Sequence, residues 1–169
     1  MKNIVLIGMP GAGKSTVGVL LAKTLGYAFL DTDLVIQERE GKLLQALVDE
    51  LGVEAFLERE ADAICSVDCV NTVIAPGGSA VCRDRAMEHL KSLGRIVYLH
   101  LPLEELEHRL HNISTRGIAM APGETLAHIY DYRAPLYRKY ADLTVEVGRQ
   151  TLEETVAAVR AAHPYEEPV

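Results

Sequence analysis

Residues 8–16 read GMPGAGKST and directly follow the apolar segment IVLI of residues 4–7. From Gly8 to Ser15 the stretch fits the P-loop pattern GxxxxGK[ST] in full. Glycine lets the backbone turn sharply and aim several N–H groups at one centre. A helix that starts near Lys14 adds the positive end of its dipole at the same place. The stretch therefore predicts a strand, loop and helix that together bind the phosphates of a nucleoside triphosphate.

The polar side chains of this loop have separate expected tasks. The ammonium group of Lys14 reaches the β- and γ-phosphates, and the hydroxyl group of Ser15 binds Mg²⁺. The residues expected to contact the nucleotide are Gly11, Ala12, Gly13, Lys14, Ser15 and Thr16. GTPases need an NKxD motif and large ATPases need a hydrophobic run ending in Asp-Glu, and the chain has neither. The class that remains is a compact phosphotransferase that uses MgATP.

Short apolar segments alternate with longer amphipathic ones along the whole chain. The expected strands are residues 4–7, 27–30, 72–75, 95–100 and 143–147. The expected helices are residues 14–25, 34–41, 43–51, 54–67, 83–93, 103–111, 124–140 and 152–162. Continuously apolar strands separated by helices predict an α/β fold with a parallel sheet covered on both faces. We expect one domain over residues 1–162, with a mobile lid loop at about 112–123 and a frayed tail at 163–169.

Composition narrows the range of partners. The chain has 169 residues, a net charge of −7 and no stretch of ~20 apolar residues that would span a bilayer. This balance argues against broad contacts with nucleic acid or with anionic lipid. The cysteines Cys65, Cys69 and Cys82 form neither a metal-binding pattern nor a disulfide framework, which favours a reducing, cytoplasmic setting. A domain this small is expected to be a monomer that acts on a small molecule.

Two stretches predict the site for the acceptor of the phosphoryl group. Asp31 and Asp33 follow the second strand, where an open parallel sheet binds its ligands. One carboxylate could serve the metal ion and the other could orient or deprotonate an acceptor hydroxyl, although each could instead cap the next helix. Gly77 and Gly78 follow the third strand and permit a ligand to approach the backbone, although a tight turn explains them equally well.

A basic residue on the lid loop has two readings. Arg116 could stabilise charge on the transferred group and exclude water, or it could be an ordinary solvated side chain. Arg109 precedes the loop and Arg133 follows it, in RAPLYRKYAD of residues 133–142.

Taken together, these stretches resemble the shikimate kinase family over nearly the whole chain, to about residue 160. The matching segments are GMPGAGKST, LDTD, GVEAFLERE, APGGSAV, RLHNISTRGIA and RAPLYRKYAD, in the order of the family. The resemblance implies a three-layer α/β/α sandwich with a five-stranded parallel sheet, similar to the nucleoside monophosphate kinases. It also implies transfer of the γ-phosphate of MgATP to shikimate, giving ADP and shikimate 3-phosphate, a step of aromatic amino acid biosynthesis.

The resemblance assigns roles position by position. Lys14, Asp33 and Arg116 would be catalytic, with Asp33 as the candidate base and Arg116 as the lid arginine. Ser15 and Asp31 would serve the metal ion, Asp31 through water. Arg109 would lie against the adenine. Asp33, Gly77, Gly78 and Arg133 would bind the acceptor, with Arg133 on its carboxylate.

Three positions depart from the family. Leu57 stands where the family has an arginine that grips the shikimate carboxylate, and Ser79 replaces the last residue of a triple glycine. Gly117 replaces a proline of the lid. Arg59 is no substitute for the lost arginine, because two residues along a helix turn the direction by about 200°. The loss of one such contact predicts shikimate binding weaker by about one to three decades.

The residues leave alternatives open. Because every departure touches the acceptor site or the lid, the chain could phosphorylate a different polyol or hydroxy acid. A non-catalytic ATP-binding module is a second alternative, although Lys14, Ser15 and Asp31 are all present. A nucleoside monophosphate kinase is disfavoured, because residues 34–90 contain no recognisable phosphate-binding arginine pattern.

Overall fold

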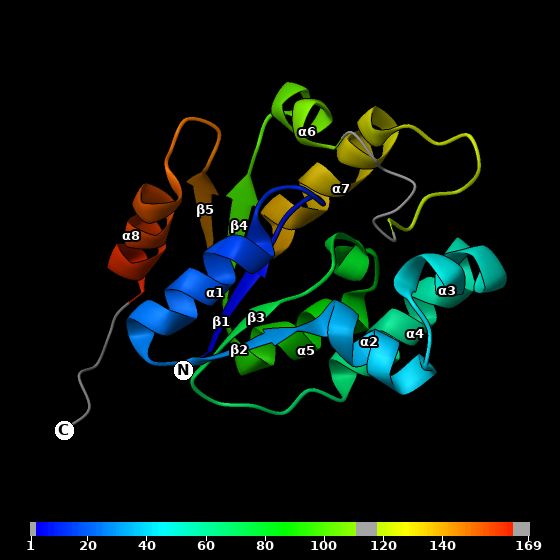
Figure 1. The fold of residues 1–169 in the computed structure, drawn as a ribbon, viewed down its shortest axis with the longest axis horizontal. Coiled ribbons are helices and arrows are strands. Elements are labelled where there is room, and N and C mark those ends of the chain that lie inside the picture. Colours follow the sequence, from blue (N-terminus) through cyan, green and yellow to red (C-terminus); the bar gives the residue numbers. More distant parts are fainter. Residues whose placement is uncertain (1–2, 111–117, 164–169) are drawn as a thin grey trace.

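A single parallel sheet organises the computed structural model, which describes residues 3–110 and 118–163 (Figure 1). Its five strands lie in the order β2-β3-β1-β4-β5. The strands are β1 (Asn3–Ile7), β2 (Ala28–Asp31), β3 (Thr72–Ala75), β4 (Gly94–His100) and β5 (Leu143–Glu146). Every neighbouring pair is parallel, so all carboxyl ends lie at one edge of the sheet. The loop after the central strand β1 therefore opens between the ends of its neighbours.

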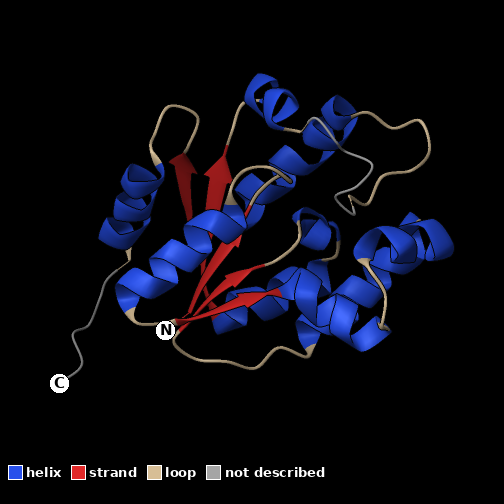
Figure 2. Ribbon diagram, in the orientation of Figure 1, coloured by secondary structure: helices blue, strands red, loops and turns tan. Residues whose placement is uncertain are grey.

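Helices cover both faces of the sheet. The helices are α1 (Lys14–Leu25), α2 (Thr32–Glu40), α3 (Leu44–Leu51), α4 (Val53–Cys65), α5 (Asp84–Leu93), α6 (Leu103–Arg109), α7 (Leu126–Tyr140) and α8 (Leu152–Ala162), with a 3₁₀ turn, η1 (Gly78–Cys82), after β3. In Figure 2 α1 lies in front of the strands, while α5 and α7 lie behind them. All residues of β1 and β3 are buried, as their apolar sequences require when both faces are covered.

A second, smaller core lies beside the sheet. Helices α2, α3 and α4 pack on one another at one end of the molecule (Figure 1). Their apolar side chains form a cluster separate from the main core, made of Ile36, Leu44, Leu47, Val48, Phe56, Leu57, Ala63 and Ala119. Ala119 joins this cluster from the chain segment that precedes α7. The small core therefore fixes the helices that face the loop after β1.

The expected fold class is confirmed, and several element boundaries differ from the prediction by one or two residues. A capping side chain explains two of these differences. Helix α2 begins at Thr32 rather than at residue 34, because the Asp31 side chain accepts a hydrogen bond from the N–H of Asp33. Helix α7 begins at Leu126 rather than at residue 124, because Thr125 caps it. The 3₁₀ turn η1 was not predicted.

The described residues carry two further features. Within residues 3–110 and 118–163 no helix combines the length and the apolar character needed to cross a membrane. The thiols of Cys65, Cys69 and Cys82 are free. Of the tail predicted at 163–169, His163 is buried at the end of α8 and the rest lies outside the described residues.

A buried polar side chain fixes the amino ends of three strands. The Asn3 amide donates to the carbonyl oxygens of Cys69 and Leu93 at 2.7 and 3.0 Å, and it accepts from the N–H of Thr72 at 2.9 Å. Gly94 pairs with Asn3 in the sheet, and a methyl group on Gly94 would overlap the backbone oxygen of Asn3. Only glycine permits this approach of β4 to β1.

We expect Gly94→Ala to lower the free energy of unfolding by about 1–3 kcal/mol, because the strands must separate to admit the methyl group. Gly148→Ala is the matched control, since its methyl group would make ordinary contacts of 3.4 Å or more. Urea denaturation of both variants and the wild type measures the difference. Equal stability of the two variants would contradict the assignment.

Candidate active site

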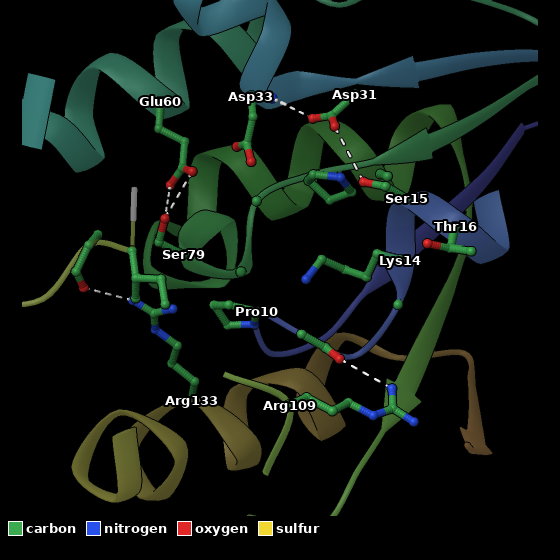
Figure 3. A pocket seen from close by; sticks show the side chains of 18 of the residues that line it. Pro10, Lys14, Ser15, Thr16, Asp31, Asp33, Glu60, Ser79, Arg109 and Arg133 are labelled. Carbon is green, nitrogen blue, oxygen red and sulfur yellow. Dashed lines mark hydrogen bonds between the residues drawn. The ribbon is translucent and has the colours of Figure 1, made fainter. Parts of the chain in front are cut away.

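A cavity of about 480 Å³ opens at the carboxyl edge of the sheet. Its walls come from the loop after β1, the ends of β2 and β3, helices α4 and α7, and the segment before α7. Figure 3 shows the side chains of Lys14, Asp33, Glu60 and Arg133 turned toward this space. Segments that are far apart in the sequence thus converge where the parallel strands end.

The loop after β1 has the backbone that phosphate binding needs. Gly11 and Gly13 have φ angles of 86° and 91°, in the left-handed region that favours glycine. Gly13 is the N-cap of α1, so the first N–H groups of this helix face the cavity. The arrangement gives an anion site at a helix N-terminus. Ala12 differs from its neighbours, because its N–H donates to the carbonyl of Met9 at 3.1 Å and its side chain is buried.

Lys14 is held against this loop. Its Nζ donates to the carbonyl oxygens of Gly8 and Met9 at 2.8 and 3.0 Å. Burial lowers the pKa of Lys14 to about 8, although the nearby Asp33 carboxylate acts to raise this pKa. A bound phosphate would favour the charged form of this ammonium group. At the rim, Arg109 is exposed and its Nη1 donates to the carbonyl of Gly11 at 3.3 Å.

Ser15 and Asp31 form a pair that suits Mg²⁺. The Ser15 hydroxyl donates to Oδ2 of Asp31 at 3.3 Å, while Oδ1 of Asp31 caps α2. A hydroxyl and a carboxylate beside a phosphate site are the oxygen donors that Mg²⁺ takes together with nucleotide phosphates and water. Asp31 thus serves both readings drawn from the sequence, as helix cap and as candidate metal residue.

Asp33 lies one helical position inside α2 and its carboxyl group faces the acceptor side of the cavity (Figure 3). A methyl group on Gly77 would lie 2.7 Å from Oδ1 of Asp33, so the carboxylate would have to shift if residue 77 carried a side chain. Burial raises the pKa of Asp33 to about 6, and the nearby charge of Asp31 adds to the rise. A carboxylate with a raised pKa, close to the phosphate loop, is placed to accept the proton of an acceptor hydroxyl.

Arg133 brings a buried positive charge to the opposite wall. Its side chain is 3% exposed, and its Nη2 donates to the carbonyl of Ala119 at 3.0 Å. Within the described part of the chain, Nη1 has no hydrogen-bond partner. A buried donor without a partner is unfavourable, and a carboxylate of the acceptor would satisfy it.

Sequence reasoning left out Glu60, which lines the same cavity. Its side chain is 2% exposed, and the Ser79 hydroxyl lies 2.7 Å from Oε1 and 2.9 Å from Oε2. Burial raises the pKa of Glu60 to about 7, although the hydrogen bond from Ser79 opposes this rise. A sequence signal existed, because Glu60 lies four residues after Phe56 and shares its buried helix face.

The remaining expected residues divide into two groups. Gly77 and Gly78 line the cavity beside Asp33, and Tyr137 fixes them by donating to the carbonyl of Gly78 at 2.6 Å. Leu57 belongs to the small core and borders a second cavity of about 240 Å³, which Arg133 also lines. Arg116 and Gly117 lie outside the described residues.

Comparisons with known proteins agree on one family. The family model for shikimate kinase matches residues 10–162. A shikimate kinase of Pseudomonas paraeruginosa is 39% identical over 97% of this chain and 99% of the relative. One of Pseudomonas entomophila is 42% identical over 89% of each.

Solved structures give the same relationship. A shikimate kinase from Acinetobacter baumannii in complex with shikimate has a TM-score of 0.86 and 30% identity, over 96% of this chain and 92% of that chain. A deoxyadenosine kinase from M. mycoides, at 11% identity and a TM-score of 0.62, shares only the fold.

We expect Glu60→Gln to stabilise the ligand-free protein above pH 7, because the buried carboxylate is replaced by a neutral amide. Folding raises the pKa of Glu60, so the carboxyl group binds its proton more tightly in the folded protein than in the unfolded chain. The folded state therefore loses stability as the pH rises from about 4.5 to 7. The gain at pH 8 is up to about 3 kcal/mol and disappears near pH 4.5. Thermal unfolding at both pH values measures it.

Glu58→Gln is the matched control on the same helix. Glu58 is exposed and paired with Arg83 and Arg85, so this variant should gain no stability at pH 8. A similar gain in both variants would contradict the role of burial at Glu60.

Proposed function

The chain belongs to the shikimate kinase family, and we propose that it transfers the γ-phosphoryl group of MgATP to the 3-hydroxyl group of shikimate. The observation that carries this proposal is the cavity in which a phosphate loop, a carboxylate of raised pKa and a buried guanidinium group face one another, the last with no partner for its Nη1 among the described residues. These groups match the phosphate, hydroxyl and carboxylate of the two substrates.

On the nucleotide side, the chain positions and neutralises phosphate. The N–H groups at the start of α1 and the Lys14 ammonium group bind the phosphates, and Ser15 with Asp31 would hold Mg²⁺. When bound, Mg²⁺ neutralises charge on the phosphate oxygens. Arg109 would lie along the adenine. The sequence alone supports Arg116 as the lid arginine.

On the acceptor side, Asp33 orients the attacking hydroxyl group. Its carboxylate accepts a hydrogen bond from this hydroxyl and takes its proton as the bond to phosphorus forms. Gly77 and Gly78 leave space for the acceptor next to the backbone. Lys14 stabilises the charge that builds up on the transferred group.

Arg133 binds the carboxylate of shikimate. Because Leu57 lies in the small apolar core, we propose that this carboxylate depends on Arg133 without a second arginine at position 57. Planar guanidinium groups bind carboxylates through two parallel hydrogen bonds, so one well-placed arginine still gives direction as well as charge.

We also propose that one chain suffices for activity, because all residues assigned on both sides belong to it. The kinase domain would extend over residues 1–162. The free thiols of the three cysteines support work in a reducing compartment such as the cytoplasm.

The proposal is tested by coupled ADP release with MgATP and shikimate, beside a panel of polyols, sugars and hydroxy acids. We expect turnover that requires shikimate. A clear rate with another acceptor and none with shikimate would overturn the assigned substrate, and ADP release without any acceptor would indicate an ATPase.

We expect Asp33→Asn to lower kcat by about 10²- to 10⁴-fold, because the amide cannot accept the proton. In the wild type, kcat/KM for shikimate should fall as the pH drops below about 6, where Asp33 becomes protonated. Asp68→Asn, in an exposed loop, is the control. Asp33 would not be the base if the acid limb of the pH profile persisted in the variant.

We expect Arg133→Met to raise the KM for shikimate by about 10- to 1,000-fold with a smaller change in the KM for ATP, because only the acceptor loses its cation. Arg138→Met removes an exposed arginine from the same helix and should change neither constant. Equal losses for ATP and shikimate would speak against a carboxylate contact.

A further inference from the structure

Glu60 is a buried acid of the cavity that has no role in the proposed phosphoryl transfer. Glu60 projects from α4 into the acceptor side of the cavity and is 2% exposed. Among the described residues, Glu60 accepts hydrogen bonds from a single donor, the hydroxyl group of Ser79. No guanidinium or ammonium nitrogen in this part of the chain lies within ion-pair distance of Glu60. A carboxylate this deeply buried is normally paired with a cation or neutralised.

The titratable and charged groups near Glu60 come from four elements of the fold. Asp33 of α2 raises its pKa, while Arg133 of α7 and Lys14 of α1 lower it. Cys82 of η1 also faces it, and the Glu60 charge helps to raise the pKa of this thiol. Two cations therefore face two carboxyl groups before any ligand binds.

The two carboxyl groups face the same point of the wall. A methyl group on Gly77 would lie 2.7 Å from Oδ1 of Asp33 and 2.9 Å from Oε2 of Glu60. An acceptor placed between Asp33 and Arg133 therefore passes directly along Glu60. If the acceptor carries a carboxylate, a further negative charge enters the part of the cavity where Asp33 and Glu60 already face Lys14 and Arg133.

We propose that Glu60 is a specificity-determining residue of the acceptor site: its carboxyl group, held by Ser79, takes up a proton when a carboxylate-bearing acceptor binds and donates a hydrogen bond to that acceptor. The proton comes from solvent and returns there when the product leaves. The inference rests on the proposed function, since it concerns how the same cavity receives shikimate.

Protonation of Glu60 has two effects on binding. It removes the repulsion between the carboxylate of the acceptor and Glu60. The positive charge of Arg133 then interacts with the acceptor carboxylate without competition from Glu60. It also converts a group that only accepts hydrogen bonds into one with an O–H donor. Both effects favour an anionic, hydroxylated acceptor over a cationic one.

Ser79 sets the pH at which this happens. Its hydroxyl donates to the ionised carboxylate and lowers the pKa of Glu60, while burial raises that pKa to about 7. Loss of the hydroxyl should therefore shift the protonation of Glu60 to higher pH. A residue that only filled space would leave the pH dependence where it is.

The test is calorimetric titration of the full chain with shikimate at pH 6 to 8.5, in buffers of different ionisation enthalpy. We expect binding at pH 8 to take up protons, approaching one per shikimate, and the Kd to rise about tenfold between pH 6 and pH 8. In Glu60→Gln the uptake should disappear and the Kd should stay near its low-pH value. In Ser79→Ala the rise in Kd should begin at higher pH.

Glu58→Gln, two residues away on the same helix, is the control and should bind and take up protons like the wild type. Binding without proton uptake, or uptake that persists in Glu60→Gln and so comes from Lys14 or Asp33, would overturn the role of Glu60. An unshifted profile in Ser79→Ala would overturn that of Ser79. These failures differ from failure of the proposed function, in which the wild type would neither bind nor phosphorylate shikimate.

Discussion

Four ionisable side chains from four different helices share one partly enclosed cavity, and the other features of the site depend on how their charges balance. Lys14 comes from α1, Asp33 from α2, Glu60 from α4 and Arg133 from α7. Burial disfavours the charged form of each titrating group, so the pKa of Lys14 falls while those of Asp33 and Glu60 rise. The folded protein thus holds buried charged groups at a cost in stability, a common trade of stability for function.

The same contacts that build the fold also place these charges. Asp31 caps α2 with one carboxylate oxygen and accepts from Ser15 with the other, so the position of the helix and the proposed metal site are coupled. Tyr137 donates to the carbonyl of Gly78 and thereby holds the turn after β3 against α7. A change in either contact would move the acceptor wall relative to the phosphate loop.

Leu57 and Ser79, which both depart from the pattern of the shikimate kinase family, can be explained together. Leu57 completes the small core of α2, α3 and α4, where an arginine would have to bury its charge. Ser79 supplies a hydroxyl group to Glu60, an acid that no described cation pairs. Its neutral hydrogen bond stabilises the buried carboxyl group less than an ion pair would, which keeps the pKa of Glu60 within the physiological range.

The sequence by itself determined the fold class and the approximate positions of the strands, and it predicted the nucleotide side of the site. These depend on local patterns: apolar segments of strand length, and a glycine-rich loop whose backbone alone makes an anion site. It also predicted, through resemblance to a family, that Asp33 and Arg133 bind the acceptor, and the structure places both in the cavity. Tertiary structure showed that Glu60 is buried in the cavity, although its acidic neighbours Glu54, Glu58 and Asp62 suggest a solvated helix. It also decided that Leu57 packs in a core beside the cavity. Burial and charge balance arise from elements distant in sequence, and local patterns do not record them.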